Sequence, residues 1–199
     1  GIGKTRLAEE AAARLAAAGG REAWARCPEE EGVPAWWPWR QVVRSLGADP
    51  DAVLVPPPDT GADAARFTVY ERVLARLREA AQSGPVAVVA DDVQWADPAS
   101  LRCLAHLARE LRHVPVLLVL TLRDGATSAA GAELDLLRSA LSRTRGTTSL
   151  AVPPLAPEAV GELLEGIAGE AVATEHAREL AARTGGNPLF VSEYARLPR

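Results

Sequence analysis

Val86-Ala87-Val88-Val89-Ala90-Asp91-Asp92 is an apolar run that ends abruptly in two acids. A continuous apolar run of this length is typical of a parallel strand that is buried on both faces. In open α/β sheets, ligands bind at the carboxyl ends of the strands, which is where Asp91 and Asp92 would lie. The stretch therefore predicts an α/β fold with a polar site at one edge of a parallel sheet.

Strand and helix patterns alternate on both sides of this run. Further strands are predicted over 22–27, 116–122 and 147–152. Helices are predicted from apolar spacing within 5–18, 67–77, 98–111 and 134–141, and one more follows the tryptophans at 36–39 and ends near Leu46. Residues 47–61 contain four prolines and predict an exposed linker. After Pro153-Pro154 the apolar spacing is helical. We therefore expect a three-layer core over 1–152, with helices on both faces of the sheet, and a small all-helical lid, itself incomplete, over 153–199.

The composition is that of a folded globular protein, with 48% hydrophobic and 24% charged residues. The net charge of −4 argues against a broad basic face, so nucleic-acid contacts are expected only through domains outside this chain. Cys27 and Cys103 lack CxxC spacing, so neither a disulfide framework nor a zinc site is indicated, and a reducing cytoplasm is favoured. The longest apolar run, 114–122, contains Pro115 and is too short to span a bilayer, so no membrane contact is expected.

Gly1-Ile2-Gly3-Lys4-Thr5 matches the second half of a phosphate-binding P-loop, in which backbone N–H groups and the helix dipole hold phosphates. Lys4 would reach the β- and γ-phosphates, and Thr5 would place its hydroxyl on Mg²⁺. The letters Gly-Lys-Thr also occur by chance at a chain end, so the motif alone leaves both interpretations open. Because the chain opens within this loop and without a methionine, we expect it to be a piece of a longer protein.

Asp91 and Asp92 are placed as in a Walker B element. In that interpretation Asp91 holds Mg²⁺ through water, and Asp92 polarises or positions the attacking water. Two acids after a strand can also simply solvate a turn. The P-loop and the acids occur in order and 87 positions apart, from Lys4 to Asp91, and together they favour nucleotide binding.

Other polar and aromatic residues have competing interpretations. Arg123 follows the strand 116–122 at the edge where the acids lie, so it would either sense a γ-phosphate or be an exposed surface arginine. Asp97 is predicted to be the N-cap of the helix that follows it. Three tryptophans within 36–39 lack interleaved basic residues, which favours packing in the core over stacking with nucleic-acid bases.

Residues 1–5, 89–97, 120–123 and 184–190 read Gly-Ile-Gly-Lys-Thr, Val-Ala-Asp-Asp-Val-Gln-Trp-Ala-Asp, Leu-Thr-Leu-Arg and Thr-Gly-Gly-Asn-Pro-Leu-Phe. Together they resemble the AAA-type ATPase module of the STAND class, and most of all its origin-recognition-like form in large ATP-binding LuxR-type transcriptional regulators. The resemblance covers essentially the whole chain. The combination of four segments is far more specific than any one of them.

The resemblance implies a P-loop NTPase core with a helical lid, and a set of site residues. Nucleotide contacts are implied for Gly1, Ile2, Gly3, Lys4, Thr5, Arg6, Gly186 and Pro188. Gly186 and Pro188 would approach the adenine from the lid. Thr5 and Asp91 would bind Mg²⁺, whereas Asp92 and Arg123 would be catalytic. In the family a strand and a further glycine precede the position of Gly1, so the first strand of the sheet is expected to be missing here.

We therefore expect an ATP- and Mg²⁺-binding switch module of a cytoplasmic, multidomain bacterial signalling protein or transcription regulator, which binds ATP and ADP and self-associates on activation. Asp92 stands where AAA motors usually carry glutamate, and because aspartate is one methylene shorter, a weak and slow ATPase is expected. A DNA-loading origin-recognition ATPase is one alternative, and would carry a basic lid or a winged helix. The other alternative is a non-hydrolysing interaction scaffold with a vestigial P-loop. The presence of both the P-loop residues and the two acids argues against it.

Overall fold

The computed structural model describes all residues except 31, 59–60, 124, 126–129 and 197–199. Its described residues divide into two compact units, of which one combines Gly1–Leu7 with Ser149–Arg199 and the other is Ala8–Thr148. Helix α1 (Lys4–Ala17) runs across the boundary between Leu7 and Ala8. The predicted division into a core over 1–152 and a lid over 153–199 stays a prediction.

A parallel sheet forms the centre of the unit Ala8–Thr148. Among the described residues it has three strands, β1 (Arg21–Arg26), β2 (Val86–Asp91) and β3 (Val116–Leu120), with β2 in the middle. Both pairings are parallel, and the register places Arg26 opposite Asp91 and Ala90 opposite Leu120. All six residues of β2 are buried, as the apolar run predicts. The α/β class and the parallel sheet are thereby confirmed.

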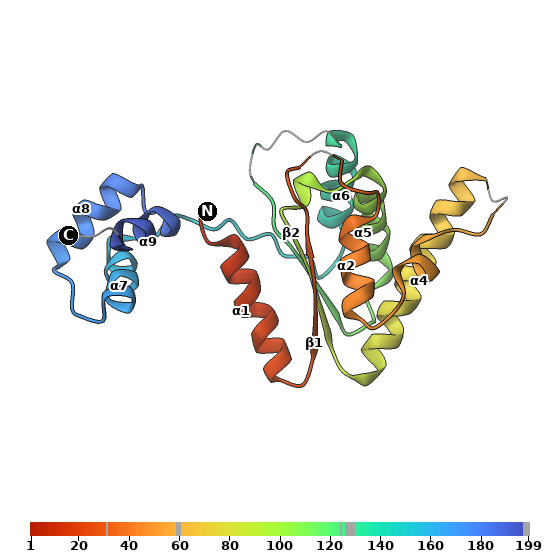
Figure 1. Cartoon of the computed structure of the whole chain (residues 1–199), viewed down its shortest axis with the longest axis horizontal. Coiled ribbons are helices and arrows are strands. Elements are labelled where there is room, and N and C mark those ends of the chain that lie inside the picture. The colour runs from red at the N-terminus through yellow and green to blue at the C-terminus, as the bar shows by residue number, and fades with distance from the viewer. Residues whose placement is uncertain (31, 59–60, 124, 126–129, 197–199) are drawn as a thin grey trace. The chain divides into compact units, whose positions relative to one another are not determined.

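The two faces of the sheet are covered by different helices (Figure 1). Because successive side chains of a strand point to opposite faces, β2 divides its apolar residues between two clusters. Ala87 and Val89 pack against Ala8 and Ala12 of α1. The opposite face packs against α2 (Trp37–Ser45), α4 (Ala62–Ala80) and α5 (Pro98–Glu110), and α6 (Gly131–Arg143) lies against α5. The prediction of helices on both faces is confirmed.

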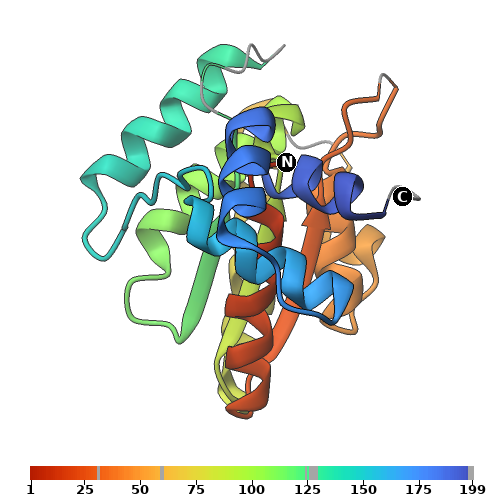
Figure 2. The same ribbon diagram turned by 90° about the vertical axis from the view of Figure 1, so that its left-hand side faces the viewer.

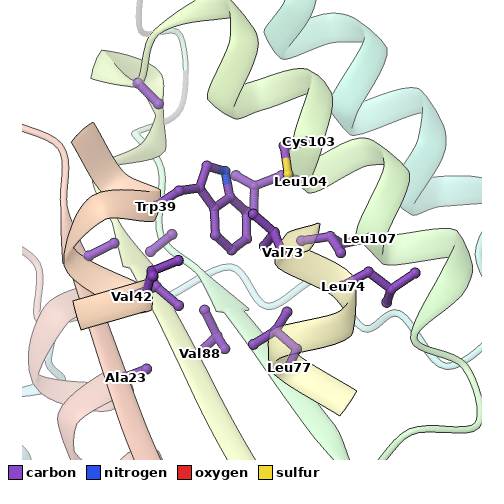
Figure 3. Packing of buried hydrophobic residues seen from close by; sticks show 14 of the residues in the cluster. Ala23, Trp39, Val42, Val73, Leu74, Leu77, Val88, Cys103, Leu104 and Leu107 are labelled. Carbon is purple, nitrogen blue, oxygen red and sulfur yellow. The ribbon is translucent and has the colours of Figure 1, made fainter. Parts of the chain in front are cut away.

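Trp39 is the largest side chain in the core on this second face. It is 2% exposed, and its side chain extends from α2 into the core, with Val42 and Leu104 nearby (Figure 3). Its indole Nε1–H donates to the carbonyl oxygen of Ser100 at 3.3 Å, so the one polar atom of the side chain is satisfied. Trp36 and Trp37 are partly buried. The prediction that tryptophans anchor the core is confirmed for Trp39.

Asp97 caps α5, as predicted, and also holds the segment before α2. Its Oδ1 accepts the backbone N–H of Ser100 at 3.0 Å, and its Oδ2 accepts the Ser100 hydroxyl at 2.6 Å. The same Oδ2 accepts the backbone N–H of Trp36 at 3.1 Å, where the chain has a positive φ of 66°. One carboxylate therefore fixes both the start of a helix and a strained turn 61 residues away.

Replacing Asp97 by alanine is expected to lower the free energy of unfolding by about 1–2 kcal/mol, because the cap and the tether to Trp36 are lost together. Asp49→Ala is the matched control, since Asp49 also precedes a proline and caps a helix, but it is exposed and accepts the N–H of Asp51. Urea denaturation should show the smaller loss in Asp49→Ala. Equal losses in the two variants would mean that the tether to Trp36 contributes nothing.

The predicted linker 47–61 is partly wrong. Its described part contains a short helix, α3 (Pro50–Leu54), in which Val53 and Leu54 are buried. Asp49 caps this helix and Pro50 occupies its first position, where the missing N–H of proline costs no hydrogen bond. The prolines predict an interruption of helical structure, but one of them, Pro50, begins a helix. Residues 59–60 of the predicted linker lie outside the described residues.

The predicted strand at 147–152 is also wrong, because these residues form neither a strand nor a helix. Their β-branched and apolar composition suits a strand, but a strand needs a neighbour for its backbone groups. The N–H of Thr147 instead donates to the carbonyl of Thr144 at 3.3 Å, which closes a turn after α6, and Leu150 is 72% exposed. Pairing is a tertiary property that apolar composition alone does not determine.

The unit that contains the C-terminal residues is helical, as predicted for the lid. It comprises α7 (Pro157–Ala168), α8 (Thr174–Thr184) and α9 (Pro188–Arg196), which are drawn in shades of blue in Figure 2. Val160, Leu164, Leu180 and Val191 form its small apolar core. Throughout the described part of the chain, no helix is long and apolar enough to cross a membrane.

Candidate functional site

The carboxyl end of β2 carries the two acids that the sequence singles out. Asp91 is the last residue of the strand and is 7% exposed, with its carbonyl accepting the N–H of Cys27 at 3.1 Å. Asp92 follows with a left-handed backbone, at φ 56° and ψ 48°. Such a conformation in a residue other than glycine costs on the order of 1 kcal/mol and is often found at functional sites. The turn aims the two carboxylates differently although they are adjacent in sequence.

Thr121 connects the two acids and was not singled out in the sequence. Its hydroxyl donates to Oδ1 of Asp91 at 2.5 Å and accepts the backbone N–H of Asp92 at 2.9 Å. Thr121 is 6% exposed and directly follows β3, so it joins the ends of neighbouring strands. A hydroxyl that ends an otherwise apolar strand was the signal that could have identified it.

Gln94 is a second residue that sequence reasoning missed. It lies in the 3₁₀ turn η2 (Val93–Trp95) and is 1% exposed. Its Nε2 donates to Oδ1 of Asp92 at 3.0 Å, and its Oε1 accepts the backbone N–H of Arg123 at 3.3 Å. The amide thereby joins the turn after β2 to the segment after β3.

Arg123 lies beside the acids, as its position after the third strand predicts. Its Nε is 3.9 Å from Oδ1 of Asp92, and its side chain is 58% exposed. An exposed pair at this distance contributes little to stability, about 0–1 kcal/mol. The guanidinium is therefore held only weakly and can take another anionic partner. The roles predicted for Arg123 and Asp92 stay predictions, but the structure brings the two side chains together.

The glycine-rich N-terminal segment leads directly into α1. Gly3 has a φ of 101°, which favours glycine, and its carbonyl accepts the N–H of Leu7 at 2.9 Å. Lys4 and Thr5 are the first two helical residues. The N–H groups of a helix's first turn carry the positive end of the helix dipole and favour bound anions. Lys4 and Thr5 therefore lie at a helix N-terminus, with Gly1, Ile2 and Arg6 beside them in the sequence. The nucleotide contacts predicted for these five residues stay predictions.

The Gly-Asn-Pro segment has clear structural roles in the same unit. Gly186 has a φ of 67°, and a Cβ there would lie 2.4 Å from the carbonyl oxygen of Leu155, so no larger residue fits. Pro188 is the first residue of α9, and its Cγ is 3.9 Å from the place that a Cβ on Gly3 would occupy. Pro188 thus lies beside the glycine-rich segment. The adenine contacts predicted for Gly186 and Pro188 stay predictions.

Cys27 lies close to this cluster of acids and is buried. Burial, followed by the charges of Asp97, Asp91 and Asp92, raises the pKa of its thiol to about 12. Burial and the charge of Asp97 also raise the pKa of the Cys103 thiol well above its usual value. A raised pKa keeps each thiol protonated at neutral pH, and the thiolate is the reactive form.

Thiol reagents at pH 8 are therefore expected to leave both cysteines unmodified in the folded protein. In denaturant both should react, because the unfolded thiols regain an ordinary pKa and full access. Mass spectrometry of tryptic peptides after brief maleimide treatment would measure this. Fast labelling of Cys27 in the folded state would contradict the burial and the acidic surroundings described here.

One of three comparisons with known proteins found a match. A model of the family described as the AAA ATPase domain matches residues 1–120, which include the glycine-rich segment and both acids. No curated protein matches the chain, and no solved structure matches it. Because the matched region is well over half of the 199 residues, the chain belongs to the AAA ATPase domain family.

Proposed function

We propose that this chain is the ATP-binding switch module of a multidomain bacterial regulator and that it hydrolyses ATP slowly. Membership of the AAA ATPase domain family implies nucleotide binding. The observation that carries the proposal further is the hydrogen-bonded arrangement of Asp91, Asp92 and Thr121 at the carboxyl end of a buried parallel strand. Such an edge is where α/β sheets bind ligands.

Lys4 is proposed to bind the β- and γ-phosphates. It is the single lysine of the sequence, beside 21 arginines. Because all the other Lys and Arg positions are arginine, a lysine at the start of α1 favours a role that needs a compact ammonium group. The backbone N–H groups from Gly1 to Arg6 would complete the phosphate contacts.

Asp91 and Thr5 are proposed to supply protein oxygens to a magnesium ion that is bound together with a nucleotide. Magnesium is usually held by one or two protein oxygens, by water and by phosphate oxygens. Asp91 offers a carboxylate whose orientation is fixed by Thr121, and Thr5 offers a hydroxyl. Bound Mg²⁺ would neutralise charge on the phosphates.

In the proposed hydrolysis, a water oxygen attacks the γ-phosphorus and the bond to the β–γ bridging oxygen breaks. ADP leaves with the bonding electron pair, inorganic phosphate is released, and Asp92 accepts the proton of the attacking water. Arg123 would sense the γ-phosphate and stabilise the charge that develops on it. Aspartate reaches less far than glutamate, so we expect slow turnover of the kind that suits a timer rather than a motor.

The regulatory context rests on the resemblance to STAND-class modules of LuxR-type regulators. We infer that ATP and ADP stabilise different states of the module and that the ATP state self-associates. The input signal and the output domain would belong to other parts of the same protein, as would any contact with DNA. The net charge of −4 supports the absence of a nucleic-acid surface here.

Isothermal titration calorimetry of the full-length protein with ATP and ADP in Mg²⁺ tests the proposal. Lys4→Ala is expected to weaken ATP binding by about 10- to 100-fold, because a charge-assisted phosphate contact is lost. Arg14→Ala is the matched control, since Arg14 lies on the same helix with an 80% exposed side chain paired to Glu10. It should bind ATP as the wild type does.

A second readout uses the position of Lys4 as the single lysine of these 199 residues. ATP should protect Lys4 from an amine-reactive reagent, which peptide mapping would show. Absence of ATP binding by the wild type, together with no protection of Lys4, would refute the switch and leave the scaffold with a vestigial P-loop as the better account.

A further inference from the structure

We infer that Gln94 is a positioning residue, which orients Asp92 and Arg123 for the chemical step without touching the nucleotide itself. This inference rests on the proposed function and adds a specific residue to it. Gln94 lies within the segment 89–97 that carries the family resemblance, but the sequence analysis gives it no role of its own. Gln94 is buried and makes two side-chain hydrogen bonds, one to each of the residues that it is inferred to orient.

Gln94 is almost completely buried. A glutamine that is 1% exposed has lost its contacts with water, which is unfavourable unless protein groups replace them. Val93 beside it is fully buried and apolar, so packing alone does not require an amide at this point. The amide is therefore explained by the groups it bonds rather than by the space it fills.

The bonds of the amide reach the two proposed catalytic residues. Its Nε2 donates to Oδ1 of Asp92 at 3.0 Å, and its Oε1 accepts the N–H of Arg123 at 3.3 Å. The Asp92 oxygen that Gln94 contacts is also the one that lies 3.9 Å from Nε of Arg123. Gln94 thereby determines which oxygen of Asp92 faces Arg123 and fixes the backbone from which Arg123 extends.

An amide is the group that this position requires, because it must donate to a carboxylate on one side and accept from a backbone N–H on the other. Glutamate would place a second carboxylate against Asp92 and could not donate. Methionine has nearly the same volume as glutamine and could make neither bond. The two variants Gln94→Glu and Gln94→Met therefore separate hydrogen bonding from packing.

Single-turnover hydrolysis and calorimetry in the full-length protein test the inference. Both variants are expected to bind ATP within a factor of about 3 of the wild type, because Gln94 makes no nucleotide contact. Their hydrolysis rate is expected to fall by about 100-fold, the size of effect that follows when a catalytic group is misplaced by about 1 Å. Gln82→Met, at an exposed glutamine in η1 (Ala81–Ser83), should keep the wild-type rate.

A double-mutant cycle distinguishes positioning from a general structural role. If Gln94 acts through Asp92, adding Gln94→Met to Asp92→Asn should slow hydrolysis little further. An undiminished effect of Gln94→Met both in that background and in an Arg123→Ala background would overturn the inference. So would a wild-type rate in Gln94→Met while ATP still binds, and so would a wild type that binds ATP without hydrolysing it. A wild type that binds no ATP would instead refute the proposed function, and the inference with it.

Discussion

Replacing Trp39 by alanine is expected to lower the free energy of unfolding by about 3–5 kcal/mol, the cost of deleting a fully buried aromatic side chain. Trp39 is 2% exposed at the centre of the core that joins α2, α4 and α5 to the sheet. Its removal leaves a cavity and deletes the hydrogen bond that the indole N–H donates to the Ser100 carbonyl. For a chain of this size the melting temperature should fall by about 6–20 °C.

Trp37→Ala is the matched control, because Trp37 starts the same helix but is only partly buried. It should cost clearly less than Trp39→Ala in urea denaturation monitored by far-UV circular dichroism. If the two substitutions cost the same, Trp39 is not the anchor of this core.

The elements with strong local signals were predictable from the sequence. The apolar run before Asp91 has the length and composition typical of a buried strand, and Asp97 followed by Pro98 has the chemistry of a helix start. The two errors have different causes. Helix α3 (Pro50–Leu54) begins with the same Asp-Pro chemistry as α5, so its start was a local signal that the neighbouring prolines obscured. The segment 147–152 has the composition of a strand, but whether it pairs depends on which parts of the chain meet, and Leu150 is exposed.

The site was only partly predictable, for a similar reason. Asp91 and Asp92 are visible in the sequence because two acids end an apolar run. Thr121 lies 30 residues from Asp91 and Gln94 lies 29 residues from Arg123, so their contacts depend on the parallel pairing of β2 with β3. The strained backbone of Asp92 is equally invisible, because aspartate is compatible with many turn conformations. The structure therefore adds the groups that orient the acids.

Replacing Asp92 by asparagine is expected to slow single-turnover ATP hydrolysis by about 100- to 10,000-fold, the usual contribution of a positioned general base. Asparagine has the same shape and also tolerates a left-handed backbone, so the turn at φ 56° should persist. Its Oδ1 can still accept from Gln94, which bonds that atom in the wild type. What is lost is the charge that accepts a proton from water. Affinity for ATP should be unchanged or slightly higher, since one negative charge is removed.

Asp135→Asn is the matched control, because Asp135 is an exposed aspartate on α6 that pairs with Arg138. It removes the same charge from the chain and should hydrolyse ATP at the wild-type rate. If Asp92→Asn also kept that rate while binding ATP, the proton would have to go to another acceptor, and the strained turn would be a structural feature. If both rate and affinity fell together, Asp92 would be needed for binding rather than for chemistry, and the division of roles between Asp91 and Asp92 would have to be abandoned.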